Sequence, residues 1–566
     1  MTRALAALVA VSVVGCGAPG GPTDAGANCP PGSDAGLGCG CGGETDGGCP
    51  GDLVCLPSDY GYPGGLCTAA CGPDEPCPAG GICLPDDLAS GTCLSPCAAD
   101  AGCGRAGWAC ILAFGACLPA GSTAGPDPGG RGAGGEGCPA VAGGGGLGIT
   151  WSRNELVGAD SGYSQATTAI AAAGPVIAIG WDIVGSESGM GLAVSTDDGE
   201  TFVTEPPLVD GTDAFQSDPA LAADDGGRFY YAWTGFDRSA ADPAVIAESR
   251  IWMAASSDAR RWEPAVEVDD LGGGGGVDKP ALAIEPVSRR PVAAYRAIVG
   301  GVEEIRASAG GPDGGSFSPS VRLDDGLRPS LGRNCAALAF DRLGHGWAAW
   351  VELGSADPNR DEDDIHGDPG NAVRTVAFGL DPDGGPVPAG SNGVASAAGA
   401  AVVQNCPGLA AAGDGSRLYL AYVAGTNEAT DVFVTSSLDG ARSWSPPVRV
   451  DADPGCATHF HPSLQLDGAG RVWVAWDENP GGVGRVAWSV STDGAETFSV
   501  AGAISEAPFD FTTSRDAPGW LGDGLQILSA GRTSLLAAWT DPRPIDRGAP
   551  GWLAPSHVYF SAAILP

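Results

Sequence analysis

The chain has 566 residues, among them 93 glycines and 46 prolines, and only 7% are aromatic. This composition argues against a helical protein and favours many short strands joined by turns. With 68 acidic and 29 basic residues, the formal net charge is -39, which argues against contact with nucleic acid or an anionic membrane surface. Cationic ligands, metal ions or a salty exterior suit this charge, unless it serves solubility alone.

Residues 1–15 are predicted to be an export signal. Arg3 gives a short positive start, and residues 4–14 form an apolar run too short to be a permanent membrane anchor. The run ends in Val13-Val14-Gly15-Cys16, which resembles a bacterial lipobox. That resemblance implies lipidation of Cys16, a tether over 16–28 and an outer-membrane or surface location. An ordinary signal peptide cleaved elsewhere is the alternative.

Residues 29–119 form a region rich in cysteine. Fourteen cysteines fall between Cys29 and Cys117, and twelve of them make three units of four: Cys41, Cys49, Cys55, Cys67; Cys71, Cys77, Cys83, Cys93; and Cys97, Cys103, Cys110, Cys117. This density predicts a small, irregular disulfide framework in an oxidising compartment, and each unit allows three connectivities. The remaining two, Cys29 and Cys39, are expected to pair. The region serves as a stalk or binds a partner.

Residues 120–148 are rich in glycine and proline and are predicted to be a linker. Cys138 lies in this linker, and Cys335, Cys406 and Cys456 follow later. Two further disulfides are therefore possible, one of which could tie the linker to the main domain.

Seven hairpins recur from residue 149 to the C-terminus, each with a glycine-containing turn and a second strand that ends in Trp or Tyr. They span Ala166 to Trp181, Pro219 to Trp233, Pro280 to Tyr295, Cys335 to Trp350, Cys406 to Tyr422, Pro462 to Trp476, and Gly524 to Trp539. A third and a fourth strand follow in most repeats. Four strands repeated radially predict an all-β propeller of seven four-stranded antiparallel blades over 149–566, with six blades as the alternative. The last blade lacks a fourth strand, and we expect residues 149–157 to supply it and close the ring.

A turn motif lies between the third and fourth strands. Ser195 to Phe202 reads Ser-Thr-Asp-Asp-Gly-Glu-Thr-Phe, in which Asp197 can accept bonds from later backbone N–H groups and Gly199 can take a positive φ. The motif recurs at 437–444 and 491–498, and degenerate copies lie at 256–262 and 313–317. Its marker residues are Ser195, Asp197, Gly199, Phe202, Ser437, Asp439, Trp444, Ser491, Asp493 and Phe498.

These copies resemble the Asp-box, or BNR, repeat of sialidase-like β-propellers. The resemblance implies that the Asp and aromatic residues of the boxes are structural and lie away from the ligand face. It places the ligand face at the starts of first strands and the ends of second strands. The residues there are Asp182, Asp218, Asp237, Arg238, Asp278, Lys279, Arg296, Asn334, Glu352, Asn405, His459, His461, Asp477, Glu478, Asp541 and Arg543. Converging polar groups suit a binding funnel, although any wet funnel would also be polar.

The sialidase resemblance implies a set of active-site residues that this sequence lacks in part. Such enzymes hold a carboxylate with three arginines and use a tyrosine nucleophile with a glutamate and an acidic residue. The first arginine belongs to an [FY]-R-I-P motif, but residues 163–167 read Tyr-Ser-Gln-Ala-Thr. Without that guanidinium the carboxylate lacks its bidentate partner. No catalytic residue is therefore assigned.

Two stretches of the sequence resemble metal sites. Asp357, Asn359, Asp361, Asp363 and Asp368 resemble the ligand spacing of a calcium loop, although Glu362 stands where glycine is usual. The alternative is an exposed acidic loop. Cys456, His459 and His461 could hold a soft metal, but Cys456 is expected to pair with Cys406 or Cys335. No cofactor is required, and calcium is possible.

The sequence therefore predicts a monomeric, exported lipoprotein, attached to a membrane only through its lipid. Its propeller is expected to bind a glycan or a protein rather than nucleic acid. The alternatives are a sialidase-like glycoside hydrolase and a structural surface protein.

Overall fold

The computed structural model describes most of residues 148–565, with gaps that include 159–163, 185–188, 209–212, 239–245, 272–274, 329–331, 355–370, 396–405, 452–456, 481–483, 510–520 and 544–555. Before residue 148 it describes seven short strands and their nearest neighbours. The described residues contain strands and turns without an α-helix, and hence no helix capable of crossing a membrane. The chain divides into two compact units.

The N-terminal unit contains three small hairpins. They are β1 (Val54–Leu56) with β2 (Leu66–Thr68), β4 (Ile82–Pro85) with β5 (Gly91–Leu94), and β6 (Trp108–Ile111) with β7 (Ala116–Pro119), and β3 (Ala70–Cys71) pairs with β5. In each hairpin the third and fourth cysteines of one predicted unit lie directly opposite: Cys55 and Cys67, Cys83 and Cys93, Cys110 and Cys117. The three units therefore share one hairpin register.

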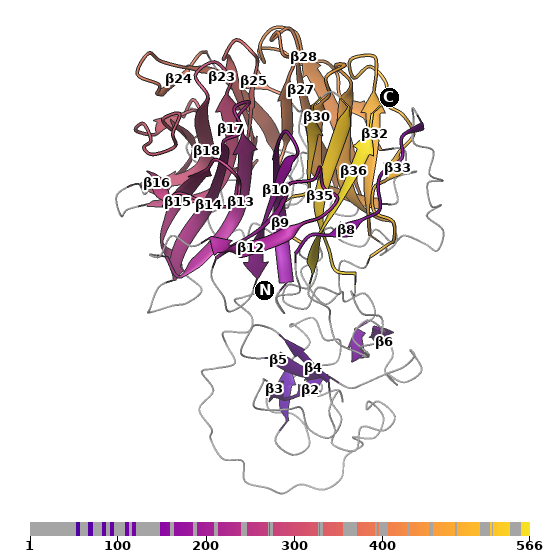
Figure 1. The fold of residues 1–566 in the computed structure, drawn as a ribbon. Coiled ribbons are helices and arrows are strands. Elements are labelled where there is room, and N and C mark those ends of the chain that lie inside the picture. The colour runs from indigo at the N-terminus through magenta and orange to yellow at the C-terminus, as the bar shows by residue number, and fades with distance from the viewer. Residues whose placement is uncertain are drawn as a thin grey trace, which may run out of the picture. The chain divides into compact units, whose positions relative to one another are not determined.

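The second unit is a propeller of seven antiparallel blades (Figure 1). Blade 1 consists of β9 (Ser164–Ala173), β10 (Val176–Val184), β11 (Met190–Ser195) and β12 (Val203–Leu208). Blade 2 consists of β13 (Phe215–Ala223), β14 (Phe229–Arg238), β15 (Ile246–Ser256) and β16 (Val266–Asp269). Blade 3 consists of β17 (Gly275–Glu285), β18 (Arg290–Val299), β19 (Val302–Ala309) and β20 (Val321–Arg322). Blade 4 has five strands: β21 (Arg333–Phe340), β22 (Gly346–Glu352), β23 (Ala372–Leu380), β24 (Pro386–Pro388) and β25 (Gly393–Val394).

Blades 5 to 7 complete the ring. Blade 5 consists of β26 (Gly408–Ala411), β27 (Leu418–Thr426), β28 (Ala429–Ser437) and β29 (Val448–Arg449). Blade 6 consists of β30 (Ala457–Leu466), β31 (Val472–Pro480), β32 (Arg485–Ser491) and β33 (Gly502–Ala503). Blade 7 consists of β34 (Gln526–Ala530), β35 (Ser534–Asp541), β36 (His557–Ile564) and β8 (Glu155–Leu156). The prediction that residues 149–157 close the ring is confirmed, because Glu155 and Leu156 pair with Phe560 and Tyr559. The count of seven blades is confirmed over six.

The hydrophobic core lies between the blades. Seven apolar clusters each combine residues of two neighbouring blades, including the junction of blade 7 with blade 1. The aromatic residues expected to end the second strands, such as Trp181, Trp233 and Trp476, instead lie within β10, β14 and β31 and are at most 2% exposed. Each blade therefore buries its faces only against its neighbours.

Three of the turns between third and fourth strands share one hydrogen-bond pattern. In the first, Ser195 Oγ accepts from Gly199 N at 2.9 Å, and Asp197 accepts from Thr201 N at 2.9 Å and Thr201 Oγ1 at 2.6 Å. The turns at 437–444 and 491–498 repeat these bonds. Donation by the Thr or Ser hydroxyl holds the pKa of each Asp at about 2.

Each of these turns also contacts the preceding blade. Phe202 lies with its ring 5.0 Å from Phe560 of blade 7, and Trp444 of blade 5 donates to Thr375 of blade 4 at 3.3 Å. Gly199 has a φ of 90°, and a Cβ there would meet the Phe560 ring at 2.6 Å. The turns therefore support contacts between blades.

We predict that Ser491→Ala destabilises the propeller by about 1–3 kcal/mol, because it leaves the buried N–H of Ala495 without an acceptor. Denaturant unfolding, followed by tryptophan fluorescence, measures this change. Ser416→Ala is the matched control, since this exposed serine bonds only within its own hairpin turn. Its expected effect is within about 0.5 kcal/mol. Equal effects of the two substitutions would contradict the role assigned to Ser491.

Candidate functional site

The funnel face is the end of the propeller at which first strands begin and second strands end. Five first strands carry a non-glycine residue with positive φ here: Thr167, Asp218, Lys279, Cys335 and His461. Strand pairing skips these positions, so each is part of a β-bulge. Bulges re-aim side chains and are frequent beside functional sites. Five of the seven blades therefore have one irregular position of this kind in their first strand.

A disulfide links two neighbouring blades at this level. Cys335 of blade 4 bonds to Cys406 of blade 5, with the Cα atoms 5.0 Å apart. The expectation that Cys456 pairs with one of these two was wrong, because each already has the other as its partner. They stand at matching places at the starts of adjacent inner strands, which brings them within disulfide distance. Cys456 itself lies outside the described residues, as do Asn405 and the five predicted calcium ligands.

Many of the predicted funnel residues are buried. Asp182, Asn334, Glu352, His459, His461, Asp477, Glu478 and Asp541 are all at most 5% exposed. Side chains alternate between the two faces of a strand, and in a propeller both faces of a blade contact neighbouring blades. The ends of the second strands therefore direct several of these groups between blades.

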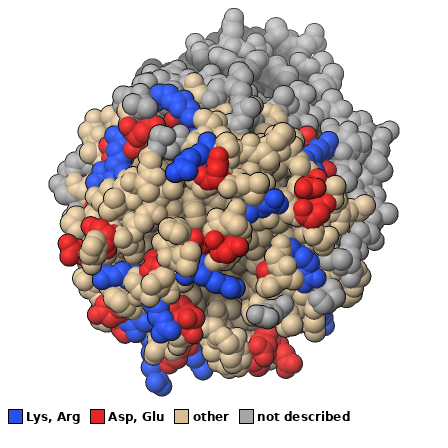
Figure 2. Space-filling model, turned by 90° about the horizontal axis from the view of Figure 1, so that it is seen from above, with Lys and Arg blue, Asp and Glu red and all other residues tan. Residues whose placement is uncertain are grey.

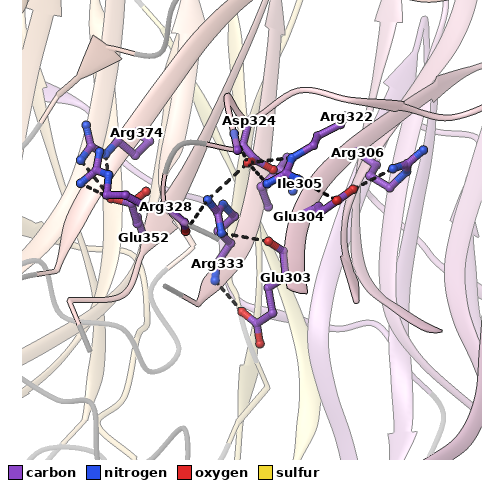
Figure 3. Close-up of polar contacts among 11 residues, drawn as sticks. Glu303, Glu304, Ile305, Arg306, Arg322, Asp324, Arg328, Arg333, Glu352 and Arg374 are labelled. Atoms are coloured by element: carbon purple, nitrogen blue, oxygen red, sulfur yellow. Dashed lines mark hydrogen bonds and ion pairs between the residues drawn. The ribbon is translucent and has the colours of Figure 1, made fainter. Parts of the chain in front are cut away.

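A network of ion pairs joins blades 3 and 4 at the funnel face (Figure 3). Arg333 begins the first strand of blade 4, and its side chain is 1% exposed. It donates to the carbonyl of Glu303 at 2.9 Å and to that of Arg328 at 3.1 Å, and lies 3.3 Å from Asp324. The Glu303 carboxylate accepts from the backbone N of Arg333 and pairs with Arg296 at 2.6 Å. Arg333 of blade 4 thus binds both the backbone and a carboxylate of blade 3.

Asp324 is the second centre of this network. One of its oxygens accepts from Ile305 N at 2.9 Å, and the other pairs with Arg322 at 2.6 Å. Arg322 also reaches Glu304 at 2.8 Å, and Glu304 in turn pairs with Arg306 at 2.7 Å. The charges form a continuous alternating chain.

Glu352 lies in the same interface. It accepts from Arg328 at 2.8 Å and Arg374 at 2.9 Å. Burial raises the pKa of Glu352, and the neighbouring guanidinium groups act in the opposite direction. The carboxylate belongs to a closed polar cluster.

The same arrangement recurs between blades 5 and 6. Asp451 accepts from Val432 N at 2.8 Å and from Arg449, and Arg449 also pairs with Asp431 at 2.7 Å. His459 occupies the place of Arg333, with Nε2 4.0 Å from Asp451 and 3.7 Å from Glu478. Asp431, Asp451 and His459 lie close enough to hold a metal ion. Arg449 already supplies the positive charge between the two aspartates, so this cluster needs no cation.

His461 and Asp477 form a buried pair in blade 6. His461 Nδ1 lies 2.7 Å from Asp477 Oδ2, and both side chains are at most 3% exposed. Burial raises the pKa of Asp477, while the bond from His461 lowers it. The pairing of His459 with Thr430 and of His461 with Asp477 engages one nitrogen of each ring. Their role as soft-metal ligands stays a prediction.

Blade 7 also contains a carboxylate at the end of its second strand, Asp541. Asp541 pairs with Arg543 at 2.7 Å, and burial raises its pKa to about 6 against the effect of that arginine. The Arg543 guanidinium lies 4.2 Å from the ring centre of Tyr559. Burial, with a smaller effect of Asp541, raises the pKa of the Tyr559 hydroxyl. Tyrosine, carboxylate and arginine therefore meet here, but with the tyrosine favoured in its neutral form.

The remaining predicted residues lie around the same face. Asp278 lies 3.5 Å from Arg296, and Asp237 accepts from Ala214 N at 2.9 Å. Asp218 accepts from Ser217 at 2.8 Å. Arg238 ends strand β14. The structure brings Asp278, Arg296, Asn334 and Glu352 to blades 3 and 4, and His459, His461, Asp477 and Glu478 to blade 6.

Several residues of the site are not predicted by the sequence patterns, notably Glu303, Asp324, Arg333, Asp451 and Tyr559. A signal for part of this set was present. Val321-Arg322-Leu323-Asp324 and Val448-Arg449-Val450-Asp451 are the same Val-Arg-x-Asp motif, placed at the end of the fourth strand of blades 3 and 5. The partner that each motif meets on the next blade was not visible in the sequence.

The opposite face carries the hairpin turns and the ends of the third strands (Figure 2). Basic and acidic side chains lie beside one another across it, as in the pairs Arg228–Glu263 and Arg289–Asp225. The described part of this face has no large area of a single charge.

No protein-family profile matches the chain, and no curated protein matches it. Several solved structures are similar to the chain. A Dyadobacter fermentans protein of unknown function has a TM-score of 0.43 at 12% identity, covering 74% of this chain and all of the other. An α-L-arabinanase of Penicillium chrysogenum has a TM-score of 0.41 at 12% identity, with 73% and 98% covered. The Hadza microbial sialidase Hz136 has a TM-score of 0.40 at 13% identity, with 69% and 73% covered. At these identities the similarity concerns the fold alone.

We predict that Arg333→Ala destabilises the propeller by about 2–4 kcal/mol, because it removes the side-chain donor to two carbonyls of a buried interface and one of the two guanidinium partners of Asp324. Denaturant unfolding measures this loss. The control is Arg328→Ala, whose side chain is 44% exposed and whose partner Glu352 keeps Arg374. Arg328→Ala should lower the free energy of unfolding by at most about 1 kcal/mol. A loss below that value for Arg333→Ala would show that the interface does not depend on this network.

Proposed function

We propose that the protein is an exported lipoprotein with an Asp-box propeller that recognises a glycan or protein through its funnel face. The observation that carries this proposal is the pairing of charge at that face. Among the described residues there, Arg296, Arg328, Arg333, Arg374, Arg449, Arg485 and Arg543 each have a carboxylate partner. A guanidinium already paired in this way offers little to a ligand carboxylate, so a neutral polar ligand suits the face best.

The Asp-box assignment is supported by the three turns with identical bonds to their Ser and Asp residues. In this interpretation the boxes stabilise the ring. The partly exposed bulge residues Asp218 and Lys279 are then the candidate ligand-binding groups.

The second candidate is a glycoside hydrolase. It is favoured by Asp541, whose pKa of about 6 is suited to a general acid. The tyrosine beside it argues against a sialidase, because the pKa of Tyr559 is raised and a nucleophile needs the phenolate. Recognition therefore remains the better supported function.

A glycan array read beside fluorogenic glycoside assays separates these functions, using the whole chain with Cys16→Ser to prevent lipidation. We expect binding to neutral glycans, or to a protein partner, without turnover. Lys279→Ala, at a bulge on the funnel face, should weaken the binding at least about tenfold. Turnover that Asp541→Asn abolishes would establish the hydrolase. Preferential binding of sialylated glycans would contradict the argument from paired arginines.

The anchor is tested separately. We predict that the wild-type chain, expressed in a Gram-negative host, incorporates labelled fatty acid and sediments with membranes, whereas Cys16→Ser does neither. Cys29→Ser is the control, since its thiol lies beyond the lipobox and should leave labelling unchanged. Equal labelling of wild type and Cys16→Ser would indicate that Cys16 is not the lipidated residue.

A further inference from the structure

We propose that a cavity between blades 1 and 2 is a second binding site, which holds one neutral sugar ring of an oligosaccharide. Its volume is about 310 Å³, at the lower end of the range of about 300–1,000 Å³ for small-molecule sites. One wall comes from Pro207 and Leu208 of β12, and the other from Trp233, Trp262 and Ala265 of blade 2. The site does not rest on the function proposed for the funnel face.

The aromatic wall is held in place by its own contacts. Trp262 donates through Nε1 to the carbonyl of Ala259 at 3.0 Å, and its ring centre lies 5.9 Å from that of Tyr231. Tyr231 also contacts Trp233 edge to face and donates to Gly191 O of blade 1 at 3.0 Å. Because its indole N–H is hydrogen-bonded, the Trp262 ring is held in one orientation at the side of the cavity. Such a fixed, partly exposed ring face is preorganised for a flat ligand.

The charges beside the cavity are paired. Glu263, which lines it, accepts from Arg228 at 2.7 Å, and Glu205 accepts from Arg260 at 2.6 Å. The second pair connects β12 to the turn before Trp262, so it also links the two walls. Because each carboxylate has its guanidinium, the site favours neither a free cation nor an anion. Hydroxyl groups, which both donate and accept, can bond to such pairs without separating unlike charges.

The other ligand classes fit less well. Addition of a peptide strand to the edge of blade 1 is disfavoured, because Pro206 and Pro207 in β12 have no N–H to donate. The cavity is also too small for the roughly 800 Å² per partner of a stable protein interface. A pyranose combines C–H groups that lie on an aromatic ring with hydroxyls at its edge, which matches the tryptophan wall and the paired charges.

The test uses the whole chain with Cys16→Ser and a panel of neutral oligosaccharides of glucose, mannose, galactose and xylose. Binding is measured by calorimetry and by quenching of tryptophan fluorescence. We expect Trp262→Ala to weaken binding at least about tenfold, and Ala265→Leu to do the same by filling the cavity while Trp262 stays in place. The matched control is Trp444→Ala, which removes the corresponding aromatic residue of the blade 5 turn and should leave binding unchanged.

Three results would overturn the proposal. The first is that no oligosaccharide of the panel binds at millimolar concentration. The second is equal affinity of wild type, Trp262→Ala and Ala265→Leu. The third is loss of binding in Lys279→Ala with retention in both cavity variants, which would place the sugar at the funnel face. Loss in the cavity variants alone supports the second site even if the funnel face binds nothing.

Discussion

The structure depends on the packing of each blade against its neighbours. A four-stranded blade has two apolar faces and no core of its own, and the seven large apolar clusters among the described residues each combine two adjacent blades. The ring must therefore close for the last faces to be buried. Residues 149–157 achieve this by adding β8 to the blade made from the C-terminal strands, which joins positions about 400 residues apart.

This packing also determines the chemistry of the funnel face. Polar side chains at the strand ends enter interfaces that exclude water, and a buried charge is tolerated only when it is paired. Blades 3 and 4 meet this condition through Arg333, Asp324 and Glu303, and blades 5 and 6 through Arg449 and Asp451. Groups that resemble catalytic or metal-binding residues in the sequence are consequently committed to one another. Of the five bulge residues, Thr167, Cys335 and His461 are buried, whereas Asp218 and Lys279 are partly exposed.

Much of the fold was predictable because its signals are local and repeated. The seven hairpins, the closing strand and the bonds of Asp197 to Thr201 follow from turn chemistry and from apolar strands that contain a Trp or Tyr, and the structure confirms them. The alignment of the cysteine units is likewise reflected in the facing positions of Cys83 and Cys93. The partners of Arg333 and the pairing of Cys335 with Cys406 were not predictable, because they join different repeats.

The sequence by itself therefore determined the class of fold and the place of ring closure and favoured seven blades over six, since each depends on periodicity and on turns of a few residues. Only the tertiary structure decided which charges neutralise each other, where Cys335 finds its partner and where a cavity opens beside Trp262. The physical reason is that these features arise at surfaces between blades. A repeat specifies its own strands, whereas the contents of an interface depend on two repeats and on the geometry of the closed ring.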